Sequence, residues 1–125
     1  IDLHINVFPV EKDKLLKDKT SGEGESSKII KDRVLKARKI QEKRFKNEKI
    51  FANFEMPNSL IEKYCKLSES SKNLLIQATE KFGLSTRAYF KLIKVSRTIA
   101  DLEAKNDIEI NHIAEAVQYR SKIFL

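Results

Sequence analysis

Apolar side chains return at intervals of three and four residues over most of the chain, which is the pattern of helices with one buried face. The pattern is longest over residues 86–102, and its expected inward positions are Ala88, Leu92, Val95, Ile99 and Leu102. Three cations, Arg87, Lys91 and Lys94, follow the same spacing almost opposite. We expect this helix to be amphipathic, with a basic stripe facing solvent.

Capping residues predict where the helices begin and end. Gly83 suits the left-handed position after a helix, and Ser85 suits the N-cap of the next, so a helix should begin at about Thr86. Ser26 or Ser27, Pro57 with Asn58, and Ser68 mark earlier starts. The expected helices cover about 26–45, 58–64, 69–82 and 86–102, with a last one from about 110.

The first 25 residues follow different patterns. Residues 3–8 alternate as a short strand would, up to Pro9, residues 11–19 suit a short charged helix, and residues 20–25 suit a flexible connection. No strand pattern follows. We therefore predict an all-α bundle of five or six helices with a short N-terminal strand, and a boundary between residues 1–24 and a helical domain over 25–125.

The positive charge is concentrated in one segment. The 125 residues carry a net charge of +7, and residues 28–49 hold ten basic against three acidic side chains, so the rest of the chain is neutral. Attraction to a polyanion should be confined to this segment. A lysine-rich helix face that only meets water fits the same pattern. The candidate contacts to DNA or to a neighbouring subunit are Lys28, Lys31, Arg33, Lys36, Arg38, Lys39 and Lys43.

Several kinds of chemistry are excluded by composition. A single cysteine, Cys65, forms no internal disulfide and favours a reducing cytoplasm, and no apolar run is long enough for a membrane span. Three glycines give no phosphate-binding Gly-x-x-x-x-Gly-Lys loop, so we expect no nucleotide to be held by this chain alone. His4 and His112 are too isolated for a metal site, and we predict none.

Arg87 is the candidate site residue that the spacing itself suggests. It falls in the first helical turn, where the helix dipole disfavours a cation by roughly 0.3–1 kcal/mol. Free N–H groups at a helix start, with a guanidinium beside them, suit a phosphate oxygen. An arginine that only meets water is the alternative. Arg97 is a weaker candidate, and its spacing from Asp101 predicts an exposed pair.

Several separated motifs together resemble the C-terminal helical domain of magnesium-chelatase-like AAA+ ATPases of the competence-associated ComM type. They are Ile1-Asp2-Leu3-His4, Gly24-Glu25-Ser26-Ser27, Arg33-Val34, Ala37-Arg38, Gln41, Tyr64-Cys65, the whole of 84–102 and 108–120. The motifs occur in the family's order. They span nearly the whole chain.

The resemblance implies a part of a larger ATPase. The nucleotide loop would lie upstream of Ile1, the strand over 3–8 would come from the core domain, and the helices would form the lid over ATP and magnesium. Ser85-Thr86-Arg87 matches the family's sensor-2 pattern, whose arginine touches the γ-phosphate. The resemblance further implies a ring of subunits that couples ATP hydrolysis to branch migration on DNA.

Two other functions compete with this interpretation. One is a free-standing helical module that binds nucleic acid through residues 28–49. The other, less favoured, is the motor subunit of magnesium chelatase, whose lid resembles the segment Val95-Ser96-Arg97-Thr98-Ile99-Ala100 and would make Arg97 the phosphate contact.

Overall fold

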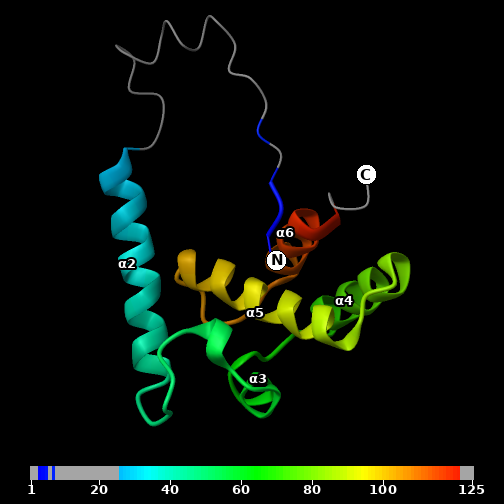
Figure 1. Ribbon diagram of the computed structural model, residues 1–125, viewed down its shortest axis with the longest axis horizontal. Helices are drawn as coiled ribbons and strands as arrows, with labels where there is room; N and C mark the ends of the chain where they lie inside the picture. The colour runs from blue at the N-terminus through cyan, green and yellow to red at the C-terminus, as the bar shows by residue number, and fades with distance from the viewer. Residues whose placement is uncertain (1–2, 6, 8–25, 122–125) are drawn as a thin grey trace, which may run out of the picture.

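A computed structural model describes residues 3–5, 7 and 26–121 of the chain. Within this part the fold is all-α. The elements are α2 (Ser27–Arg44), the 3-10 helix η1 (Asn53–Glu55), α3 (Asn58–Tyr64), α4 (Glu69–Phe82), α5 (Thr86–Leu102) and α6 (Ile110–Ser121). Figure 1 shows α5 crossing the middle of the molecule, with α2 standing at one end of it, α4 at its other end and α6 above it.

Short-range side-chain bonds set the helix starts. The hydroxyl oxygens of Ser26, Ser68 and Ser85 accept the backbone N–H groups of Ile29, Ser71 and Ala88, at 3.2, 3.1 and 3.1 Å. Each of these bonds satisfies a donor that the first turn leaves free. The predicted starts of α2, α4 and α5 are confirmed.

The hydrophobic core surrounds α5. It joins Leu92, Ile93, Ile99 and Ala100 of α5 to apolar residues of the other elements, which are Phe45, Met56, Ile61, Cys65, Leu75, Ile108, Ile113 and Ala116. Because α2, η1, α3 and α6 all pack on α5, this helix is buried on several sides, and its position determines the positions of the others.

The structure differs from the sequence predictions in three places. Residues 3–5 and 7 form no strand, since the described part of the chain offers them no partner strand and the His4 N–H instead donates to the Tyr119 carbonyl at 3.1 Å. Leu102, expected inward, is 36% exposed at the end of α5. The expected helices also leave out Asn53–Glu55, which forms η1. The short helix over 11–19 and the connection over 20–25 lie outside the described residues.

Candidate functional site

The turn between α4 and α5 places Arg87 at the surface. Gly83 ends α4 with φ 59° and ψ 42°, a left-handed conformation that glycine adopts without strain. The Gly83 and Leu84 N–H groups both donate to the Thr79 carbonyl, and Ser85 then caps α5. Arg87 is therefore held in the first turn of α5. Its side chain is exposed, and no hydrogen-bond or ion-pair partner for its guanidinium occurs among the described residues.

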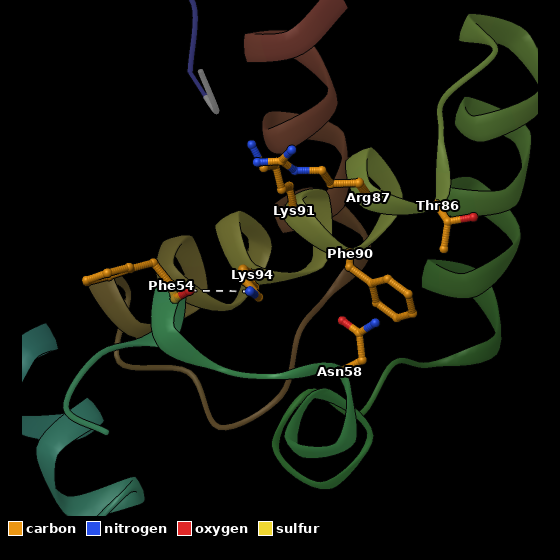
Figure 2. Close-up of a pocket in the computed structure, with 7 residues that line it drawn as sticks. All are labelled: Phe54, Asn58, Thr86, Arg87, Phe90, Lys91 and Lys94. Atoms are coloured by element: carbon orange, nitrogen blue, oxygen red, sulfur yellow. Dashed lines mark hydrogen bonds between the residues drawn. The ribbon is translucent and has the colours of Figure 1, made fainter. Parts of the chain in front are cut away.

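A shallow groove of about 470 Å³ lies beside Arg87. It is formed by η1, the start of α3 and one face of α5, with the lining residues Phe54, Asn58, Thr86, Arg87, Phe90, Lys91 and Lys94. Figure 2 shows Arg87 and Lys91 extending together to one side of α5, while Phe90 turns toward Asn58 on the other.

The groove is positively charged. Three cations line it and no acid does, so it favours an anionic ligand. Lys94 also holds the η1 wall of the groove, since its ammonium donates to the Phe54 carbonyl at 3.3 Å. The Phe54 side chain remains 75% exposed. The cations of the basic stripe predicted on α5, Arg87, Lys91 and Lys94, thus line this groove.

Arg97 is buried, and the expectation that it forms an exposed pair with Asp101 is wrong. Its side chain is 2% exposed, and Nη2 lies 3.2 Å from Oδ1 of Asp101. Nη1 and Nη2 also donate to the carbonyls of Asn106 and Lys105, at 2.8 and 2.6 Å. Burial lowers the pKa of Arg97, while the Asp101 carboxylate acts in the opposite direction. Arg97 is thereby engaged in holding the loop between α5 and α6.

Sequence reasoning missed the rest of this buried network. Arg44, at the end of α2, turns inward and donates from Nη1 and Nη2 to both carboxylate oxygens of Asp101, at 2.9 and 2.5 Å. Asn53 accepts a third bond from Arg44 and donates to Asp101 and Thr98. The spacing of Arg97 and Asp101 was a signal of pairing, but nothing local to Arg44 or Asn53 indicated burial.

The seven basic candidates of α2 form a separate surface. Lys28, Lys31, Arg33, Lys36, Arg38, Lys39 and Lys43 are all exposed, and none of them lines the groove beside Arg87. Only Ala37 and Gln41 of α2 are buried. The structure therefore separates the nucleotide-sensing candidate from the candidate contacts to DNA or a neighbour.

His112 and Cys65 are buried in the fold. His112 is fully buried, and its Nδ1 accepts the Glu109 N–H at 2.9 Å while its Nε2 lies 2.6 Å from Oε2 of Glu103. Burial raises the pKa of the Cys65 thiol to about 11. No cluster of three or more His, Cys, Asp or Glu suited to a metal occurs within the described ranges. Over the same ranges no helix is both long and apolar enough to cross a membrane.

Comparison with known proteins places this arrangement in a family context. Residues 24–120 match the family described as magnesium chelatase, subunit ChlI C-terminal. Competence protein ComM of Haemophilus influenzae is 41% identical over 106 residues, which cover 85% of this chain and 20% of that protein. The uncharacterized protein YifB of Escherichia coli is 41% identical over 103 residues, covering 82% of this chain and 20% of that protein. The chain thus spans about a fifth of the length of these relatives.

Proposed function

Because the chain belongs to the magnesium chelatase ChlI C-terminal family, in its ComM-type branch, we propose that it is the helical lid of an AAA+ ATPase whose nucleotide state is sensed by Arg87. ATP and magnesium are held by a core domain elsewhere in the protein. Neighbouring subunits complete a ring. The cytoplasmic location expected from the single cysteine belongs to the same proposal.

The observation that carries the proposal is the position of Arg87. Its guanidinium is exposed in the first turn of a capped helix and has no partner among the described residues, although the helix dipole disfavours a cation there. The oxygens of a γ-phosphate would accept hydrogen bonds from both the Arg87 guanidinium and the free N–H groups of that turn. The neighbouring cations Lys91 and Lys94 add to the positive potential.

The proposed cycle follows from this interaction. While the γ-phosphate is present, Arg87 holds the lid against the nucleotide. After hydrolysis and phosphate release, Arg87 has no anion to hold, and the lid becomes free to move relative to the core. We propose that the ring uses this motion to remodel DNA by branch migration during competence and recombination, as the likeness to a competence protein suggests.

Turnover of the longer protein tests the role of Arg87. A charge-assisted contact contributes about 1.5–3 kcal/mol, so Arg87→Ala should lower kcat for ATP hydrolysis by roughly 10- to 150-fold. Arg87→Lys should recover only part of it, because an ammonium cannot form the bidentate contact. Lys72→Ala, which removes an exposed cation from α4, is the matched control and should leave kcat unchanged. Normal turnover in Arg87→Ala would contradict the proposal.

A second candidate function is favoured by the basic face of α2. All seven candidate side chains on this helix are exposed, and residues 27–36, its N-terminal half, include no side chain buried by the described residues. A helix with this charge can follow a DNA backbone without reading its sequence. Under this proposal the chain binds nucleic acid by itself, whether or not an ATPase is attached.

Salt-dependent binding of labelled duplex DNA tests this second function. Replacing Lys36, Arg38 and Lys39 by Gln should weaken binding, and the slope of log affinity against log salt should fall by up to about 0.9 for each phosphate that α2 no longer neutralises. The triple replacement of Lys66, Lys72 and Lys81, which are exposed outside α2, removes the same charge and is the control. Equally weakened binding in the two triple variants would argue against a dedicated α2 surface.

A further inference from the structure

Helix α2 continues beyond the surface on which it packs. Ala37 and Gln41 are 4% and 7% exposed, whereas Val34 and Ile30, on the same face one and two turns before Ala37, are 41% and 47% exposed. These four positions follow the spacing i, i+4, i+7, i+11 of one helix stripe. Figure 1 shows the N-terminal half of α2 extending past α5. An apolar stripe is thus left uncovered by the described residues.

Charge restricts what can cover this stripe. Residues 27–36 carry four basic side chains and one acidic side chain. A second α2 packed alongside would bring like charges together, which destabilises an interface. The stripe instead suits an apolar surface edged with carboxylates.

The same chain carries such a surface where α5 meets α6. We call residues 102–110 the acidic corner. Leu102 and Ile110 are 36% and 49% exposed there, and the segment carries Glu103, Asp107 and Glu109 against the single cation Lys105. Both ring nitrogens of buried His112 reach this segment, Nδ1 accepting from the Glu109 N–H and Nε2 lying 2.6 Å from the Glu103 carboxylate. His112 therefore holds the two ends of the acidic corner together.

We infer that the N-terminal half of α2 in one copy docks on the acidic corner of a second copy, with Ile30 and Val34 against Leu102 and Ile110. The two surfaces differ, so the interface is head-to-tail and can close a ring. It specifies a subunit contact for the ring in the proposed function and rests on that ring, but neither Arg87 nor its groove takes part. Half of one helix covers less than the roughly 800 Å² per partner of a standard interface, so the interface is weak alone and adds to others in an assembly.

Disulfide trapping between two variants, each with one introduced cysteine, tests the interface. Ile30→Cys and Ile110→Cys chains, one of them carrying a size tag, are mixed and oxidised with copper phenanthroline. We expect the mixed dimer to form several-fold faster than either self-dimer. Native Cys65 stays silent because it is buried and its pKa is raised to about 11. The control pairs Ile30→Cys with Ile76→Cys, which lies on α4 and is also 49% exposed.

Charge reversal adds a second readout. Lys31→Glu in the Ile30→Cys chain should slow trapping, and Glu109→Lys in the Ile110→Cys chain should restore the rate. Added salt should slow trapping by the parent pair, since its rim charges attract.

Either of two results would overturn the inference. One is a mixed dimer that forms no faster than the Ile76 control. The other is fastest trapping of Ile30→Cys with itself, which would place α2 against α2. Neither result bears on the role of Arg87 in ATP hydrolysis, which is tested by turnover of the Arg87→Ala variant. Each proposal can therefore be rejected without the other.

Discussion

At the scale of single residues, Asp101 is where three elements are joined. Its carboxylate is fully buried and accepts bonds from Arg44 of α2, Arg97 of α5 and Asn53 of η1. Two guanidinium charges therefore share one buried carboxylate. Each would be left without its main anionic partner if that carboxylate were removed.

Asp101→Ala should destabilise the fold strongly. Breaking a buried pair by removing one partner costs about 3–5 kcal/mol, because the remaining charge stays desolvated. Denaturant unfolding followed by circular dichroism measures this loss. Asp107→Ala removes an exposed carboxylate from the following loop and should change the free energy of unfolding by less than about 0.5 kcal/mol. Similar losses of stability in the two variants would contradict the network.

The Cys65 thiol should make stability depend on alkaline pH. Its pKa is raised from 9.0 to about 11 by burial, so the folded state favours the neutral thiol, and this contribution is present below pH 9 and lost as the pH rises toward 11. Between pH 8 and 10.5 the free energy of unfolding should therefore fall about 2 kcal/mol more in the parent chain than in Cys65→Ala. Equal falls in both chains would show that the thiol titrates normally.

Single residues were predicted unevenly from the sequence. The exposure of Arg87 follows from its place in a capped first turn. The burial of Arg97 does not, because a spacing of four residues identifies a pair without saying how many neighbours surround the helix. Arg97 and Asp101 are covered because α2, η1 and the loop before α6 meet at the end of α5.

At the scale of elements, local capping rules explain what was predicted well. Ser26, Ser68, Gly83 and Ser85 each act on groups within a few residues, so the bounds of α2, α4 and α5 follow from sequence alone. The strand expected over 3–8 depends on a distant partner. Its alternating pattern carried no information about whether one is present.

Two equivalent caps should differ in their effect on stability. Ser85→Ala removes the N-cap of the central helix and should cost about 1 kcal/mol of unfolding free energy. Ser26→Ala removes a similar bond, but the first turns of α2 are exposed, so their fraying should cost less than about 0.5 kcal/mol. Thermal unfolding of both variants makes the comparison. A larger loss of stability in Ser26→Ala would mean that the start of α2 is packed.

At the scale of the whole molecule, burial is centred on α5, and its exposed first turn carries Arg87. The core around Leu92, Ile93 and Ala100 fixes the helix axis, while the turn at Gly83 fixes where the helix begins. The sensing candidate is thus held by the rigid centre of the fold. The basic face of α2 and the acidic corner lie on other surfaces, where assembly interfaces would not obstruct it.

The chain by itself should not bind ATP measurably. One charge-assisted contact gives about 1.5–3 kcal/mol, below the roughly 4 kcal/mol of millimolar binding. Titration calorimetry of residues 1–125 with MgATP checks this expectation. Micromolar affinity would mean that the groove beside Arg87 holds a nucleotide without a core domain.

The preference of the longer protein for triphosphate over diphosphate tests the central claim most directly. It is the ratio of the Kd values for ADP and for a non-hydrolysable ATP analogue, measured in the parent protein and in Arg87→Ala. If Arg87 contacts the γ-phosphate, the ratio should fall by roughly 10- to 150-fold in the variant, with the Kd for ADP nearly unchanged. An unchanged ratio would show that Arg87 does not sense the γ-phosphate.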